Sequence, residues 1–450
     1  MKTYDLAVLG GGPAGCAAAL MATSFRQRVA LIERNRLGGL NLHQGGIPMK
    51  SLLVNARNAR RTAKEGLQDP KGLLSDFITR QRNVVNRTYQ ELQIELENAG
   101  VAVLKGNGRL VDKNQLVVSN NGNEELIEAR KIIVATGSIT SSQTGITADG
   151  QRILDSQHIF SLIESPSQLI IIGGGYIGCE YASIFSSLGA NVTIVEQQSR
   201  LLPYMDPTAG KFLHLMFNQQ NINVLTESQV ITISNTSNAV EVKLADGRIL
   251  QSEYAILAHG RTPLKEEIGL PTTLFNSNGF VEVDNRMETR QPHLFVVGDA
   301  NGISSFAHSA ILQGRIAALN AMGDDFRFQP HFVPTCIYSF PEIAAVGWQE
   351  EQATETGYDV VCAQCPFTRV GRAVAMGELA GFVKLIADRR SQKLLGGIIA
   401  GGQAAEMIGQ ITMALHMGAT VPQLMQCTVA HPTLSEAIQE AAWNLLLKMK

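Results

Sequence analysis

Short apolar runs recur along the chain, and several of them end at a glycine-rich turn. Runs of this length, bounded by turn residues, are typical of buried strands. They lie at residues 6–9, 28–32, 131–134, 169–172, 190–195, 254–257 and 294–297. Because helical patterns stand between most of them, the sequence favours an α/β fold.

The first run leads into glycines with the G-x-G-x-x-G spacing, at Gly10, Gly12 and Gly15. In such a turn the first glycine makes the tight bend and the second lets a pyrophosphate approach the backbone. The third glycine lets the next helix pack closely, and the N-terminus of that helix then faces the phosphates. About 20 residues on, a second strand ends in Glu33, which can accept a ribose hydroxyl. Together these features predict a dinucleotide site.

The same arrangement occurs a second time. A strand, its glycine turn and a carboxylate recur 163 residues later, as Gly173, Gly175, Gly178 and Glu196. Four matched positions at one offset predict a second dinucleotide-binding domain. Glu196 is followed by glutamines rather than arginines. A carboxylate there pairs with a free 2′-hydroxyl and repels a 2′-phosphate, so we expect a preference for NAD over NADP.

Other segments complete the chain. A helical pattern covers residues 47–100, and Ser75 is expected to cap its second helix. From about Gln329 the pattern changes to strand-like segments followed by two helices, at 403–417 and 435–449. This change predicts a third domain of α+β type.

Composition narrows the function classes. With 450 residues the chain is too long for one core, and 45% hydrophobic with 17% charged residues is typical of a soluble globular protein. A formal net charge of −2 gives no reason to expect nucleic acid or an anionic membrane as partner. The apolar N-terminal run is already a strand, so we expect no secretory leader. No uninterrupted apolar stretch is long enough to span a bilayer, so we also expect no membrane span. Six cysteines form no disulfide framework, which favours a reducing, cytoplasmic location.

Taken together, the motifs resemble those of the pyridine nucleotide-disulfide oxidoreductases, with the greatest similarity to dihydrolipoamide dehydrogenase. The resemblance runs essentially end to end and rests on GGGPAG with Glu33, IVATGS, GGGYIGCE, HGRTP, VVGDA, FAH, VPTCIYSFPEIAAVG and AHPTLSEA. It implies two Rossmann-like domains, for FAD and NAD, and a C-terminal α+β domain that forms a homodimer. The expected parts are an FAD domain at 1–147 and 267–328, an NAD domain at 148–266 and a dimerisation domain at 329–450.

The resemblance also assigns cofactor-binding residues. Asp299 is expected to bind the ribitol of FAD, and the helix starting near Ala307 to direct its positive N-terminus at the flavin pyrimidine edge. Tyr176 is expected to cover the nicotinamide pocket. The expected FAD residues are Gly10, Gly12, Pro13, Ala14, Gly15, Glu33, Gly39, Lys50, Ala135, Thr136, Gly137, Asp299, Ala307 and His308. The expected NAD residues are Gly173, Gly175, Tyr176, Ile177, Gly178, Glu196, Gly260 and Arg261.

Four catalytic residues follow from the same resemblance. Lys50 and Glu180 are similar to the ion pair beside flavin N5 in the family. His431 and Glu436 are similar to the acid–base pair that one subunit lends to the flavin site of the other. His431 precedes a proline, which favours extended backbone, and Glu436 at a helix start is stabilised as an anion by the helix dipole. Glu436 can therefore hold one imidazole nitrogen and leave the other for a substrate.

The chain departs from the family in its redox segment, G-G-x-C-x-x-x-x-C-x-P-x-K. The frame from the glycine pair to Pro48 and Lys50 is kept, but the two cysteine positions hold Asn41 and Gly46. These residues cannot form a disulfide or a thiolate–flavin pair. The flavin-to-disulfide relay of the family is therefore not expected here by its usual route.

Other thiols and histidines carry weaker signals. Cys362 and Cys365 form a CxxC, but on an expected strand, where positions three apart face opposite sides. Cys16 and Cys179 follow the glycine turns and are expected to be buried. His43 either lines the position vacated by the cysteines or is only a polar surface residue. No group of His, Cys or Asp has metal-ligand spacing, so no metal is expected.

The expected function is that of an FAD-dependent NADH:acceptor oxidoreductase. Hydride from NADH would pass to the flavin and then directly to a non-disulfide acceptor, quinone-like or another small molecule, with His431 supplying a proton. One alternative is a nicotinamide nucleotide transhydrogenase. Another is a catalytically retired sensor or complex subunit that binds FAD and NAD, against which the retained Lys50/Glu180 and His431/Glu436 patterns argue.

Overall fold

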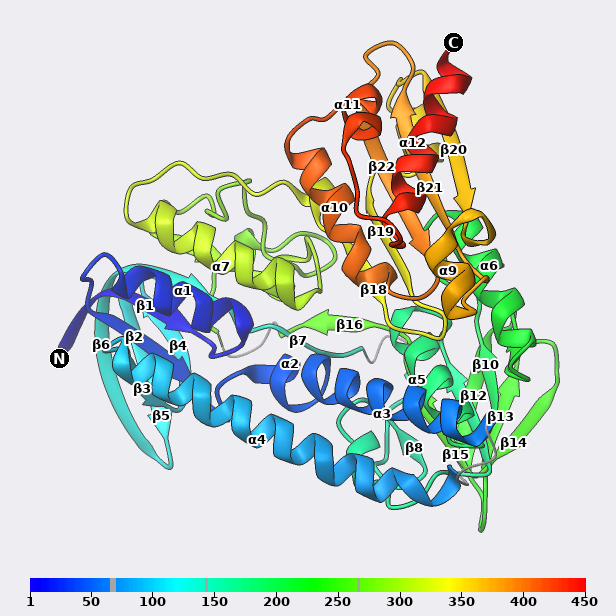
Figure 1. The fold of residues 1–450 in the computed structure, drawn as a ribbon. Helices are drawn as coiled ribbons and strands as arrows, with labels where there is room; N and C mark the ends of the chain where they lie inside the picture. Colours follow the sequence, from blue (N-terminus) through cyan, green and yellow to red (C-terminus); the bar gives the residue numbers. More distant parts are fainter. Residues whose placement is uncertain (65–69, 142–144, 265–267) are drawn as a thin grey trace. The chain divides into compact units, whose positions relative to one another are not determined.

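The computed structural model describes residues 1–64, 70–141, 145–264 and 268–450 (Figure 1). The chain forms two compact units. Unit 1 comprises Met1–Leu52, Phe77–Ser142 and Gly260–Pro330, and unit 2 comprises Leu53–Asp76, Gln143–His259 and His331–Lys450. Because each unit combines separate stretches of sequence, this partition does not test the predicted domain boundaries, which stay predictions.

Unit 1 contains a sheet with strand order β3-β2-β1-β6-β5-β4, with β17 paired to β6. The five strands β1, β2, β3, β6 and β17 pair in parallel, and β4 and β5 add an antiparallel edge. The strands are β1 (Lys2–Leu9), β2 (Val29–Glu33), β3 (Ala102–Lys105), β4 (Asn107–Asp112), β5 (Gln115–Asn120), β6 (Asn123–Val134) and β17 (Leu294–Val296). Residues Leu6 to Val8 of β1 have no solvent-exposed surface, as the apolar run at 6–9 predicts.

Helices α1 (Pro13–Thr23) and α7 (Ala307–Ala321) lie side by side and pack on this sheet (Figure 1). The chain also forms α2 (Gly39–His43), α3 (Gly46–Lys64) and α4 (Leu74–Asn98). The predicted cap at Ser75 is wrong, because a 3₁₀ turn at Lys71–Leu73 runs directly into α4 and places Ser75 inside its first turn. The strand expected at 131–134 is only the end of the 12-residue β6.

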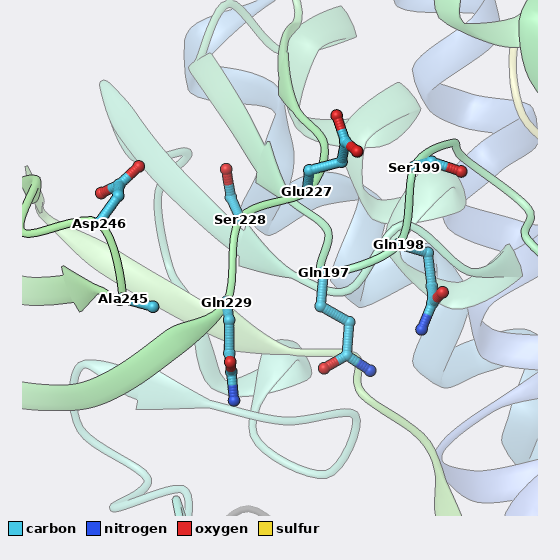
Figure 2. Close-up of a pocket in the computed structure, with 8 residues that line it drawn as sticks. All are labelled: Gln197, Gln198, Ser199, Glu227, Ser228, Gln229, Ala245 and Asp246. Carbon is cyan, nitrogen blue, oxygen red and sulfur yellow. The ribbon is translucent and has the colours of Figure 1, made fainter.

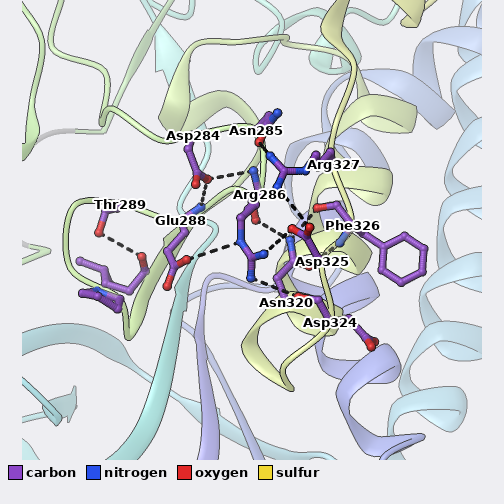
Figure 3. A network of polar contacts seen from close by, with 12 residues as sticks. Asp284, Asn285, Arg286, Glu288, Thr289, Asn320, Asp324, Asp325, Phe326 and Arg327 are labelled. Carbon is purple, nitrogen blue, oxygen red and sulfur yellow. Dashed lines mark hydrogen bonds and ion pairs between the residues drawn. The ribbon is translucent and has the colours of Figure 1, made fainter.

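A polar network in unit 1 joins the loop at residues 284–289 to the end of α7 (Figure 3). Arg286 binds the Asp325 carboxylate and donates to the Asp324 carbonyl at 3.1 Å. The Asn320 amide bonds the carbonyls of Arg286 and Phe326 at 2.9 and 2.8 Å. These bonds fix the C-terminal end of α7, whose N-terminus belongs to the candidate site.

Unit 2 contains a parallel sheet with strand order β11-β10-β9-β15-β8. Helices α5 (Tyr176–Ser187) and α6 (Pro207–Asn218) pack on it, and a three-stranded antiparallel sheet, β12-β13-β14, is attached. The strands are β8 (Ile153–Leu154), β9 (Gln168–Ile172), β10 (Asn191–Val195), β11 (Asn223–Leu225), β12 (Val230–Asn235), β13 (Val240–Leu244), β14 (Ile249–Ser252) and β15 (Tyr254–Leu257).

The C-terminal part of unit 2 is an antiparallel sheet, β18-β19-β22-β21-β20, covered by α10 and α12. Its α+β character confirms the prediction. The elements are β18 (Thr335–Ile337), β19 (Ile343–Gly347), α8 (Glu350–Glu355), β20 (Val360–Pro366), α9 (Gly371–Met376), β21 (Phe382–Asp388), β22 (Leu394–Ala400), α10 (Ala404–His416), α11 (Val421–Gln426) and α12 (Glu436–Met449). Among the described residues no helix is both long and apolar enough to cross a bilayer.

Candidate active site

The two glycine turns have the same backbone geometry. Gly10 and Gly173 take positive φ angles of 107° and 111°, which favour glycine. A Cβ on Gly15 would collide with the Gly10 carbonyl, and one on Gly178 with the Gly173 carbonyl. Close packing of helix on strand therefore requires glycine at both third positions.

The middle glycine of each turn has a different environment. A Cβ built on Gly12 or on Gly175 meets no atom within 4 Å. Each of these residues is the N-cap of its helix, α1 or α5, and neither helix has an acidic residue in its first turn. Open space at a helix N-terminus suits a bound pyrophosphate, so both turns fit a dinucleotide.

Glu33 at the end of β2 and Glu196 directly after β10 accept the same kind of backbone hydrogen bonds. Glu33 accepts hydrogen bonds from the backbone N–H groups of Gly11 and Asn35, each at 2.7 Å. Glu196 accepts them from Gly174 at 2.6 Å and Gln198 at 2.7 Å. Both carboxylates are thus fixed beside their glycine turns, where a ribose would lie.

Two buried hydroxyls in unit 1 support the fit to FAD. The Oγ atoms of Thr136 and Ser304 are buried and have no hydrogen-bond partner within the described chain. Thr136 was predicted as an FAD residue and stands between Ala135 and Gly137, which has a positive φ of 73°. Ser304 was not predicted, because it lies in a polar loop without a distinctive motif. Buried hydroxyls of this kind are normally satisfied, and cofactor oxygens could satisfy them.

Asp299 lies in the 3₁₀ turn η4 (Gly298–Asn301), which a buried glutamine holds in place. The side-chain oxygen of Gln313 accepts from the Gly298 N–H and from the Asn301 amide, each at 2.8 Å. Gln313 is fully buried on α7. α7 starts at Ala307, as predicted, and His308 stacks on Phe306 at its N-terminus with ring centroids 5.4 Å apart.

A polar pocket of about 810 Å³ opens next to Glu196 in unit 2 (Figure 2). Glu196 itself is buried, with 6% of its surface exposed. The lining residues are Gln197, Gln198, Ser199, Glu227, Ser228, Gln229, Ala245 and Asp246. Amides, hydroxyls and carboxylates in this position suit the hydroxyls of a ribose and disfavour an additional phosphate.

The remaining predicted NAD residues lie in both units. Tyr176 and Ile177 open α5, directly after the second glycine turn. Gly260 and Arg261 belong to unit 1, where Gly260 has a positive φ of 114° and Arg261 begins β16 (Arg261–Pro263).

Lys50 and Glu180 lie on helices of different units, Lys50 on α3 and Glu180 on α5, so their predicted pairing stays a prediction. Glu180 is 2% exposed, and its Oε1 accepts from the Tyr338 N–H at 3.1 Å. One turn further along α5, Ser183 Oγ accepts from the Phe340 N–H at 3.1 Å. The backbone that leads from β18 therefore fixes the face of α5 that carries Glu180.

Asn41 and Gly46 lie next to each other in unit 1. Asn41 is on the short helix α2, and Gly46 is the first residue of α3. A Cβ built on Gly46 would collide with Asn41 Oδ1 and would lie 2.9 Å from Asn41 Cγ. The Asn41 carboxamide therefore occupies the space that a side chain at position 46 would need.

His43 is held by the segment that precedes α2. Its Nε2 is 2.8 Å from the Leu37 carbonyl, and since a carbonyl only accepts, Nε2 carries the proton in this contact. Its ring packs edge-on against Tyr89 of α4, with centroids 5.6 Å apart, and Arg36 lies over the same Tyr89 ring at 4.3 Å. Burial lowers the pKa of His43. These contacts indicate a neutral residue that anchors α2.

His431 and Glu436 form a defined pair at the start of α12. His431 Nδ1 lies 2.7 Å from Glu436 Oε1, and the second carboxylate oxygen accepts from the Thr433 N–H at 2.9 Å. The hydrogen bond from His431 lowers the pKa of Glu436, so the carboxylate stays ionised near neutral pH. The His431 side chain is 77% exposed. This arrangement fits a carboxylate-oriented imidazole with its other nitrogen toward solvent.

Four of the six cysteines, Cys16, Cys179, Cys362 and Cys365, lie in environments that suppress thiolate formation. Burial raises the pKa of Cys16 to about 12 and that of Cys179 well above its usual range. On β20, burial raises the pKa of Cys362 to about 12 and that of Cys365 to about 11. Cys365 belongs to the main C-terminal core, whereas Cys362 packs on a separate small cluster, so the two thiols face opposite sides of the strand. Within the described ranges no cluster of three or more His, Cys, Asp and Glu could hold a metal.

Fold and site together define a flavoprotein with two dinucleotide turns and a C-terminal α+β part. The profile of the pyridine nucleotide-disulphide oxidoreductases matches residues 4–314, and that of their dimerisation domain matches residues 333–442. The chain therefore belongs to the pyridine nucleotide-disulfide oxidoreductase family. FAD and NAD(H) are the cofactors of this oxidoreductase family, the predicted fold class is confirmed, and the dimerisation domain supports a homodimer.

Dihydrolipoyl dehydrogenases and related flavoproteins match along nearly the whole chain. A dihydrolipoyl dehydrogenase of Zymomonas mobilis is 36% identical over 451 residues, covering 97% of both chains. One from Bacillus subtilis is 33% identical over 446 residues, again with 97% coverage of each. The crystal structure of LpdA from Mycobacterium tuberculosis matches with a TM-score of 0.91 at 27% identity, covering 99% of this chain and 100% of that one. The HOCl-induced flavoprotein disulfide reductase RclA of Escherichia coli, as its Cu(II) complex, matches with a TM-score of 0.87 at 28% identity, covering 98% of this chain and 99% of that one.

Proposed function

We propose that this protein is an FAD-dependent NADH:acceptor oxidoreductase that reduces a small non-disulfide acceptor, such as a quinone, without a thiol relay. The observation that carries the proposal is the pair Asn41 and Gly46 at the two positions where the family motif has cysteines. The Asn41 carboxamide fills the space beside Gly46, so this segment is packed around its own residues.

Four of the six cysteines lie in environments that do not suit a replacement thiol. A reactive cysteine needs a lowered pKa and access to its partner. Cys362 and Cys365 have raised pKa values and face opposite sides of β20, and Cys16 and Cys179 are buried behind the glycine turns. These environments support a reaction that uses no disulfide.

The chain's own residues supply binding and proton delivery. FAD, when bound, accepts the hydride of NADH and supplies the electrons for the acceptor. The turn at Gly173–Gly178 would hold the pyrophosphate of NADH at the start of α5, and Glu196 would accept a ribose hydroxyl. Glu436 accepts a hydrogen bond from His431 Nδ1–H, so in the imidazolium form of His431 the Nε2–H would donate its proton to the acceptor at the partner subunit's flavin and leave a neutral imidazole.

Rapid mixing under anaerobic conditions tests this proposal. NADH should bleach the flavin absorbance much faster than NADPH, because Glu196 and the polar pocket beside it, which contains Glu227 and Asp246, disfavour a 2′-phosphate. The reduced enzyme should show no long-wavelength thiolate–flavin band. Quinones should then reoxidise it, whereas dihydrolipoamide with NAD⁺ should give only background turnover.

The outcomes separate the remaining functions. Robust turnover of dihydrolipoamide would refute the proposal and imply that another thiol acts. Fast reoxidation by an oxidised nicotinamide nucleotide, but not by quinones, would identify a transhydrogenase. A flavin that NADH does not reduce would identify a binding or sensor protein.

A further inference from the structure

Three stretches of unit 1 that are distant in sequence meet at Ser138. Strand β7 (Ser138–Thr140) pairs antiparallel with β16, so that Ser138 lies opposite Pro263 and Thr140 opposite Arg261. The turn η4, which carries Asp299, packs against β16. Ser138 therefore stands between a cationic and an anionic side chain.

The contacts at Ser138 form a chain of hydrogen bonds. The Ser138 hydroxyl donates to Asp299 Oδ2 at 2.5 Å. Arg261 Nε donates to the same hydroxyl oxygen at 2.8 Å, and a terminal nitrogen of Arg261 donates to the Ser138 carbonyl at 2.7 Å. Hydrogen bonds with a charged partner are short and strong, and a donor at the hydroxyl oxygen polarises its O–H further.

The Ser138 hydroxyl fixes the Asp299 carboxylate, while the Gln313 side chain fixes the backbone of η4. An ionised carboxylate has about four acceptor sites, so one bond from Ser138 leaves capacity for the hydroxyls of a sugar alcohol. Arg261 directs two of its donors at Ser138, which lies in unit 1 with Asp299.

We propose that Ser138 is a positioning residue for FAD, and that Arg261 orients it so that Asp299 is preset for the ribitol chain. Arg261 then serves the flavin site rather than the NAD site to which its sequence motif assigned it. This inference rests on the family's use of FAD and on the predicted role of Asp299, and it is independent of the acceptor.

Release of FAD from the holoenzyme tests the inference. Flavin fluorescence rises when FAD leaves the protein, so its increase after dilution gives the release rate. Ser138→Ala should release FAD roughly tenfold faster, the effect of one lost charge-assisted hydrogen bond. Ser138→Thr keeps the hydroxyl and should release FAD at about the parental rate. Arg261→Lys cannot make the forked contact and should accelerate release roughly fivefold.

Controls separate this role from general destabilisation. Arg290→Lys changes an exposed ion pair with Glu282 in the same unit and should release FAD at the parental rate. Circular dichroism melting should show each variant folded at the assay temperature. With FAD saturating, the KM for NADH should stay within about twofold of the parent in the Ser138 and Arg261 variants. The reason is that the contacts changed by these variants are those that hold Asp299, the residue expected to bind FAD.

Two results would overturn the inference. One is a Ser138→Ala variant that retains FAD as the parent does. The other is an Arg261→Lys variant that releases FAD at the parental rate but has a higher KM for NADH. That result would show that Arg261 contributes to NAD binding, as first predicted. Failure of quinone reduction would leave the FAD-release result unaffected, so the two proposals fail separately.

Discussion

The segment at 41–46 and the pair at 431–436 differ in how much of the family's chemistry they keep. At 431–436, an ionised Glu436 holds His431 by Nδ1 at 2.7 Å. At 41–46, an uncharged carboxamide packs on a glycine. We therefore propose that proton delivery and thiol relay are separable parts of this fold, and the following experiments test that separation.

Placing cysteines at positions 41 and 46 should give the largest change in activity of the variants considered. A Cβ at position 46 lies 2.9 Å from Asn41 Cγ. With a carbon–carbon bond of about 1.5 Å, the two Cβ atoms would be at most about 4.4 Å apart, within the ~3.5–4.5 Å range of disulfides. The double variant Asn41→Cys/Gly46→Cys should therefore form a disulfide and gain lipoamide reductase turnover above the parental background.

The single variants are the controls for this experiment. Gly46→Cys alone places a side chain against the Asn41 carboxamide and should lower the free energy of unfolding by roughly 1–3 kcal/mol, as overpacking does. Neither single variant should gain activity. A double variant that forms the disulfide but stays inactive with lipoamide would show that more than two residues separate this chain from its relatives.

Removing the imidazole should slow acceptor reduction by roughly 10²-fold, the usual contribution of a general acid. In His431→Ala, reduction of the flavin by NADH should stay within about twofold of the parent, since proton delivery belongs to the later step. Stopped-flow absorbance measures both half-reactions separately. Reoxidation at the parental rate would exclude His431 as the acid.

Neutralising Glu436 should have a smaller effect, roughly tenfold on reoxidation, because the imidazole remains but loses its anionic partner. The hydrogen bond from His431 lowers the pKa of Glu436, so its ionised form is lost only as pH falls below about 4.5. Between pH 5 and 8 the parent therefore keeps the anion. Reoxidation in Glu436→Gln should therefore stay about tenfold slower than in the parent across this pH range, whereas Glu440→Gln on the same helix should match the parent.

The smallest effect is expected at His43. Because burial lowers its pKa, the unfolded chain binds the proton more readily, and stability should fall as pH drops through about 6.5. His43→Gln should weaken this pH dependence and cost about 1 kcal/mol at pH 8 through the lost bond to Leu37. Acceptor kinetics should not change. A tenfold loss of acceptor turnover would instead place His43 in the acceptor site.

Local patterns were sufficient for much of the molecule. The run Leu6–Leu9, the matched glycine turns and the helix starting at Ala307 are each specified within a few residues, because strand burial and tight turns depend on neighbours in sequence. The expected cap at Ser75 failed because an unforeseen 3₁₀ turn continued into α4. Element boundaries of this kind depend on how adjoining turns join.

By itself the sequence determined the family and the doubled dinucleotide architecture, and it led us to predict that Asn41 and Gly46 stand where the family motif has its two redox cysteines. Only the tertiary structure decided that Ser138 bridges Arg261 and Asp299, residues that are 123 and 161 positions away from it. It also decided that His43 binds Leu37 and packs on Tyr89 of α4. The physical reason is that a hydrogen bond between distant segments depends on where the whole fold places them, and no spacing along the chain encodes that position.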